Sequence, residues 1–133
     1  MPITVSIVED NEQLRGTLAR VLNRADGFRC LSQYGDAESA LEGLPRDRPE
    51  VVLMDINLPG LDGLAATRRI REIESLRAVP IVAVTAFGTE GFQRAAYDVG
   101  IEGYLTKPLD LDRMHQLIAR LLSAGESGNL KAS

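Results

Sequence analysis

The segment VVLMDINLPG, residues 51–60, joins a short apolar run to Asp55 and to a turn at Pro59 and Gly60. Four consecutive apolar residues without polar alternation are typical of a strand covered on both faces, as in a parallel sheet between helices. Asp55 would then stand at the carboxyl end of a central strand, where open α/β sheets bind their ligands. This segment therefore predicts the fold class and indicates where a functional site would lie.

Apolar runs of similar length occur elsewhere, at residues 3–8, 28–34, 80–84 and 103–106. The run at 28–34 is more polar than the others and predicts an edge strand. The segments between the runs carry apolar residues at helical spacing. They predict helices behind Asn11, over 37–44 between Asp36 and Pro45, over 64–73, over 87–99, and from 111 to about 122.

Strand and helix therefore alternate five times along the chain. A parallel strand pair needs a crossover connection, and such crossovers are right-handed. The pattern predicts a doubly wound α/β fold, with a five-stranded parallel sheet in the flavodoxin-like order 2-1-3-4-5 and five helices.

Length and composition narrow the class of protein. The 133 residues predict one domain, expected over residues 1–124, followed by a flexible tail or linker remnant at 125–133. The net charge of −4 argues against direct nucleic-acid binding, which needs a basic surface. One cysteine and one histidine exclude an internal disulfide and a multi-cysteine or histidine-rich zinc site. No apolar run reaches membrane-spanning length and no signal peptide is visible, so we expect a cytoplasmic protein without a membrane contact.

Polar residues stand at the carboxyl ends of the predicted strands. Glu9 and Asp10 follow the first strand, Asp55 ends the third, Thr85 ends the fourth and Lys107 follows the fifth. These ends meet at one edge of the sheet. Three carboxylates there repel one another unless a cation joins them, and an all-oxygen set suits Mg²⁺, with Mn²⁺ as the alternative. A carboxylate can accept a phosphoryl group, whose oxygens an ammonium and a hydroxyl would hold.

Four motifs at these strand ends resemble those of the receiver domain of two-component response regulators, over roughly residues 3 to 123. The motifs are VEDN at 8–11, LMDINLPGLDG at 53–63, VTA at 84–86 and YLTKP at 104–108. Each is modest alone, but four in order at the predicted strand ends are specific.

The resemblance implies a role for each carboxylate. Asp55 would accept a phosphoryl group from a histidine kinase or a histidine phosphotransfer protein. Glu9, Asp10 and Asp55 would bind Mg²⁺, with the backbone carbonyl of Asn57 completing the protein ligands. Asn57 and Phe87 would flank the path of a hydrolytic water and so tune dephosphorylation.

The resemblance also implies a switch. Thr85, Ala86 and Lys107 would form the phosphoryl-binding group, and Tyr104 would turn inward when Thr85 moves toward the phosphoryl group. The surface formed by residues 87–99, 103–106 and 111–122 would change for partner binding. The bond before Pro108 would be a cis peptide, which an X-Pro bond makes accessible.

Other functions fit these residues less well. A haloacid-dehalogenase-like phosphatase needs a second Asp two positions after the nucleophile, where this chain has Asn57. A flavodoxin-like electron carrier needs a phosphate-binding loop after the first strand, where this chain has Glu9 and Asp10, which would repel the phosphate. We therefore expect a signalling phosphoacceptor and not an enzyme, acting on a downstream protein target as a monomer or a phosphorylation-dependent dimer. The alternative is a receiver fragment of a larger DNA-binding regulator or hybrid histidine kinase.

Two further groups of residues are predicted to have structural roles only. Cys30 is expected to be a buried, unreactive thiol. Arg68, Arg69 and Arg71 are expected on a solvated face of the helix over 64–73.

Overall fold

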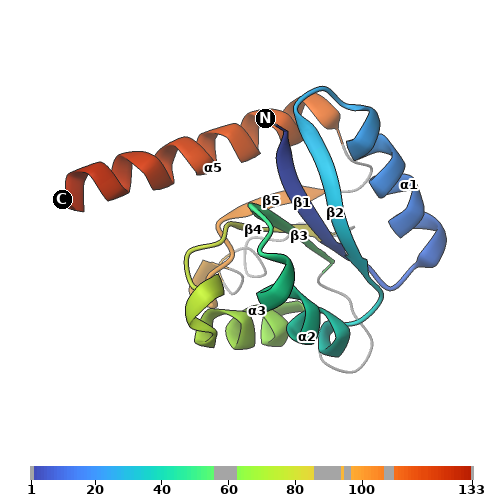
Figure 1. Ribbon diagram of the computed structural model, residues 1–133, viewed down its shortest axis with the longest axis horizontal. Helices are drawn as coiled ribbons and strands as arrows, with labels where there is room; N and C mark the ends of the chain where they lie inside the picture. The colour runs from blue at the N-terminus through green and yellow to red at the C-terminus, as the bar shows by residue number, and fades with distance from the viewer. Residues whose placement is uncertain (1, 56–62, 86–93, 95–96, 107–109, 133) are drawn as a thin grey trace.

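Helices cover both faces of a five-stranded parallel sheet (Figure 1). The computed structural model describes residues 2–55, 63–85, 94, 97–106 and 110–132. The strands are β1 (Ile3–Val8), β2 (Phe28–Tyr34), β3 (Val51–Asp55), β4 (Ile81–Thr85) and β5 (Gly103–Thr106). Their order is β2-β1-β3-β4-β5, which confirms the predicted topology and places the more polar strand β2 at an edge.

The helices agree in part with the prediction. They are α1 (Glu12–Arg24), α2 (Ala37–Asp47), α3 (Gly63–Glu72), the 3-10 turn η1 (Glu74–Leu76) and α5 (Leu111–Ala132). The helix expected over 87–99 lies mostly outside the described residues; of its described positions, 94, 97 and 98 are helical and 99 lies in a turn.

Two predicted helix starts are confirmed by their capping contacts. The side chain of Asn11 accepts a hydrogen bond from the backbone N–H of Leu14 at 2.9 Å. Asp36 accepts one from the N–H of Ser39 at 2.7 Å. Each contact satisfies a donor that the first turn of a helix leaves without an intrahelical partner.

The predicted end of α2 at Pro45 is wrong. The helix continues through Pro45 to Asp47, and the N–H of Arg48 donates to the carbonyl of Leu44 at 2.9 Å. A proline in the last turn removes one hydrogen bond, but the bonds on either side can persist. The helix ends at Asp47 and is capped by Arg48, where φ is 50°, in the left-handed region.

The predicted end of the last helix near residue 122 is also wrong. α5 is helical over 22 residues, and its final turns extend away from the sheet (Figure 1). No proline follows Leu111, and a glycine in a helix costs only about 1 kcal/mol, so the helix can propagate beyond its packed part. The flexibility of residues 125–133 stays a prediction. Within the described ranges, none of the helices is both long enough and apolar enough to cross a bilayer.

Both faces of β3 are buried, which explains its continuous apolar run. Met54 packs in a cluster with Leu44 of α2 and Ile70 of α3. Leu53 packs in a second cluster with residues of α1 and α5, among them Ile118. All four apolar residues of β3 are at most 1% exposed. Asp55 is thereby held at the end of a rigid central strand.

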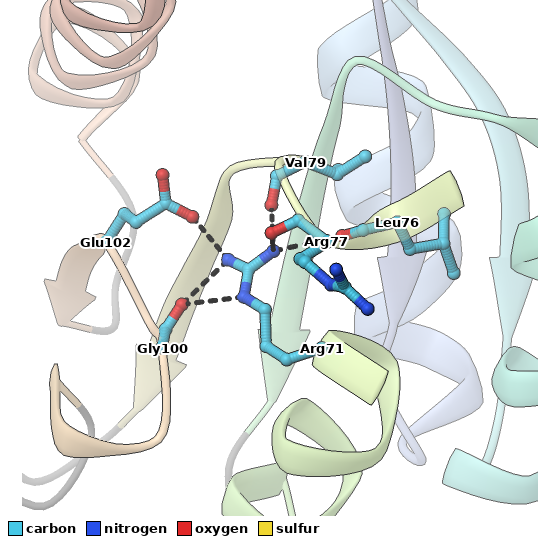
Figure 2. Close-up of polar contacts among 6 residues, drawn as sticks. All are labelled: Arg71, Leu76, Arg77, Val79, Gly100 and Glu102. Atoms are coloured by element: carbon cyan, nitrogen blue, oxygen red, sulfur yellow. Dashed lines mark hydrogen bonds and ion pairs between the residues drawn. The ribbon is translucent and has the colours of Figure 1, made fainter. Parts of the chain in front are cut away.

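Arg71 was predicted to lie on a solvated face of α3, and this prediction is wrong. Its side chain is 17% exposed, and its guanidinium donates to the carbonyls of Leu76, Arg77, Val79 and Gly100 (Figure 2). It also forms an ion pair with Glu102. Burial raises the pKa of Glu102, and the charge of Arg71 acts in the opposite direction. Arg68 and Arg69 are exposed, as predicted.

Candidate functional site

The carboxyl ends of β1, β3, β4 and β5 lie side by side at one edge of the sheet. Val8 of β1 pairs with Met54, and Asp55 pairs with Val84 of β4. Thr85 then pairs with Thr106, the last residue of β5. The register therefore brings together the segments that carry the predicted site residues.

Three carboxylates converge at this edge, as predicted. Glu9, Asp10 and Asp55 each offer an oxygen, and these oxygens lie within 4.8 Å of one another. Glu9 is 2% exposed and Asp55 is 5% exposed, while Asp10 is exposed. Negative charge gathered in a partly buried place is unfavourable without a cation.

This donor set fits a hard divalent cation. Carboxylate oxygens are among the ligands that Mg²⁺ takes, and Mg²⁺ commonly keeps waters and substrate phosphate oxygens in its shell. The exposure of Asp10 leaves one side of the cluster open to solvent. The arrangement can therefore hold a metal ion beside the Asp55 carboxylate.

The turn between β1 and α1 is fixed by several hydrogen bonds at Glu9. Its N–H donates to the carbonyl of Tyr34 at 2.9 Å, and its carboxylate accepts the N–H of Asn11 at 3.2 Å. Its carbonyl accepts a hydrogen bond from Nη1 of Arg15 at 2.8 Å. Arg15 was not among the site residues predicted from the motifs. The available signal was its place one turn into α1, since long helical side chains point toward the helix N-terminus.

Tyr34, whose carbonyl holds Glu9, ends the edge strand β2. Its hydroxyl donates to the carboxylate of Asp47, the last residue of α2. Burial raises the pKa of Tyr34 above its ordinary value, and the hydrogen bond to Asp47 adds to this. The phenol is thus kept neutral as a donor, and it ties the end of β2 to α2.

The other predicted site residues are described only in part. Thr85 ends β4, and Tyr104 lies in β5 half-buried against the cluster that includes Ala83 and Ile101. Asn57, Ala86, Phe87, Lys107 and Pro108 lie outside the described residues, so their predicted roles stay predictions.

Comparison with known proteins decides the family. Residues 5–119 match the model of the response regulator receiver domain. The chain belongs to this family. Membership confirms the resemblance seen in the four motifs and implies a role in two-component signal transduction. The convergence of the carboxylates at the sheet edge agrees with it.

Relatives cover nearly the whole receiver domain. The polar-differentiation response regulator DivK of Brucella anthropi is 38% identical over 122 residues, which are 92% of this chain and 98% of that protein. DivK of Brucella abortus is 37% identical over the same shares.

Solved structures of receiver domains share the fold. One, from a Pseudomonas aeruginosa sensor histidine kinase, is 32% identical with a TM-score of 0.80, and covers 92% of this chain and 99% of that chain. It has a magnesium ion coordinated in its active site cleft. A LuxR-family response regulator from Aurantimonas has a TM-score of 0.85 at 29% identity, over 93% of this chain and 87% of that one.

Proposed function

We propose that this receiver domain accepts a phosphoryl group on Asp55 in a two-component phosphorelay. The donor would be a phosphohistidine of a histidine kinase or of a histidine phosphotransfer protein. The observation that carries the proposal is the convergence of Glu9, Asp10 and Asp55 within 4.8 Å at the carboxyl edge of the sheet. The magnesium ion in the cleft of the Pseudomonas aeruginosa receiver domain supports the same chemistry.

The reaction is a transfer between two nucleophiles. An oxygen of the Asp55 carboxylate attacks phosphorus, the P–N bond breaks, and the donor imidazole keeps the electron pair and takes up a proton. Mg²⁺ held by Glu9, Asp10, Asp55 and the carbonyl of Asn57 would offset the negative charge of the carboxylate and phosphoryl oxygens. The burial of Asp55 at the end of β3 fixes the direction from which the donor must approach.

Phosphorylation would be read out as a change of surface. Thr85, Ala86 and Lys107 would hold the phosphoryl oxygens, and Tyr104 would reorient in response. The segment 87–99, β5 and α5 would then bind a downstream protein target in a changed form. In this proposal the domain is a cytoplasmic signalling protein and not an enzyme, and it does not contact nucleic acid itself.

Incubation with acetyl phosphate tests the proposal directly. Wild type with Mg²⁺ is expected to gain the mass of one phosphoryl group, and this gain should disappear with EDTA. Asp55→Asn should gain nothing, because an amide cannot act as the nucleophile. Asp26→Asn is the matched control, since Asp26 is an exposed aspartate before β2, and it should behave as wild type.

Two results would contradict the proposal. Labelling of Asp55→Asn at the wild-type level would place the acceptor elsewhere. Repeated turnover of a phosphomonoester, without a stable phosphoprotein, would favour the phosphatase alternative.

A further inference from the structure

We propose that Arg15 is the residue that positions the acidic loop for metal binding. It touches neither the metal nor the phosphoryl group in this proposal, but it fixes the backbone from which Glu9 and Asp10 project. The inference rests on the proposed function, because it concerns the affinity of the same site for Mg²⁺.

Arg15 connects three parts of the fold. It belongs to α1, and its Nη1 donates to the carbonyl of Glu9 in the turn after β1, at 2.8 Å. The same nitrogen lies 3.0 Å from the position that a β-carbon would take at Gly35, the residue directly after β2. The side chain is half-buried, which restricts the positions that its guanidinium can take.

The carbonyl that Arg15 holds belongs to the peptide plane between Glu9 and Asp10. Because that plane is rigid, fixing its oxygen sets the direction in which the chain enters Asp10. Tyr34 holds the N–H of Glu9, so the backbone of Glu9 is held on both sides. Arg15 thus restrains the one exposed carboxylate of the cluster, that of Asp10, whose own side chain is least confined by burial.

Gly35 provides the space for this contact. A β-carbon at residue 35 would stand 3.0 Å from Nη1 of Arg15 and 3.7 Å from Cζ. Gly35 is not among the described glycines with a positive φ, so alanine is compatible with its backbone. Gly35→Ala would therefore shift the guanidinium by a few tenths of an ångström without removing its charge.

The test is the dissociation constant for Mg²⁺, measured by calorimetry on the unphosphorylated protein, together with thermal unfolding without metal. Arg15→Met is expected to weaken Mg²⁺ binding about tenfold, as loss of a group that orients metal ligands does. Gly35→Ala should also weaken Mg²⁺ binding, but by less than Arg15→Met does. Arg20→Met is the control, since Arg20 is exposed on the same helix and its hydrogen bond within the described residues is a local one, to Thr17.

The outcomes separate this inference from the proposed function. The positioning role would be overturned if Arg15→Met bound Mg²⁺ with wild-type affinity. A lower melting temperature would not rescue it if the affinity, measured well below that temperature, were unchanged. If Arg15→Met fails to fold, Gly35→Ala decides, and unchanged affinity there would also refute the role. If wild type and Asp55→Asn bind Mg²⁺ equally weakly, the proposed function itself fails, and the inference fails with it.

Discussion

Replacing Arg71 by methionine would remove a charged group that ties α3 to two distant segments. Methionine keeps an unbranched apolar side chain of similar length, so the change removes mainly the hydrogen bonds. The carbonyls of Val79 and Gly100 would each lose a partner at 2.7 Å, and those of Leu76 and Arg77 one at 3.1 Å (Figure 2).

The expected loss of stability follows from the two shorter bonds. A hydrogen bond to a charged donor contributes about 1.5–3 kcal/mol. The two longer bonds, to the carbonyls of Leu76 and Arg77, are left out of the sum because water can take the place of Arg71 as a donor in this half-buried region. Two bonds at the lower value give about 3 kcal/mol. For a chain of 133 residues this corresponds to a melting temperature lower by about 10 °C. Arg71→Lys should recover only part of the loss, because one ammonium cannot face both carbonyls as the planar guanidinium does.

Urea unfolding followed by circular dichroism measures this directly. Arg68→Met is the matched control, an exposed arginine on the same helix, and it should change stability by less than about 0.5 kcal/mol. Equal stability of Arg71→Met and Arg68→Met would show that these hydrogen bonds contribute nothing measurable. Full stability in Arg71→Lys would show that the charge alone is sufficient and would contradict the role given to the planar guanidinium.

Further expectations concern other parts of the domain. Gly43→Ala should lower stability by about 1–3 kcal/mol, because its methyl carbon would stand 2.7 Å from Cε1 of Tyr34. At an unobstructed helix position the same substitution usually stabilises the protein. An unchanged or raised melting temperature would therefore contradict this clash. Hydrogen bonds from Ser39 in the first turn of α2 lower the pKa of Asp36, so the stability that the ionised carboxylate contributes is present above the ordinary value of 3.8 and is lost as pH falls through the lower folded pKa. Asparagine can cap the helix without ionising, so the free energies of unfolding of wild type and Asp36→Asn should differ most in favour of wild type above 3.8 and least at the acidic end, and a difference independent of pH would refute the lowered pKa. Cys30 is half-buried and not fully buried as predicted, and this partial burial raises the pKa of its thiol above 9.0. Alkylation by iodoacetamide should therefore still accelerate above that pH, and a plateau below it would contradict the shift. Phe87→Ala should shorten the life of the aspartyl phosphate, measured by loss of the phosphoryl mass, and slower hydrolysis would count against the predicted role of Phe87 in tuning dephosphorylation.

Much of the fold could be predicted because its signals are local. The uninterrupted run of β3 reflects burial on both faces, and the polar strand β2 is an edge strand. Asn11 and Asp36 act as caps because a cap depends on the three residues that follow it. The predicted end at Pro45 failed because a proline near a helix end removes only one bond, and whether the helix continues depends on its surroundings.

The sheet order and the convergence of Glu9, Asp10 and Asp55 could be predicted from the order of the elements along the chain, because parallel strands joined by right-handed crossovers bring their carboxyl ends to one edge. The contacts of Arg15 and Arg71, in contrast, are apparent only in the folded protein. Arg71 contacts Gly100, 29 residues further along the chain, and Arg15 lies against Gly35 on another strand end. Such contacts depend on how separate elements pack and on the direction in which a long side chain leaves its helix, and helical spacing alone does not specify either one.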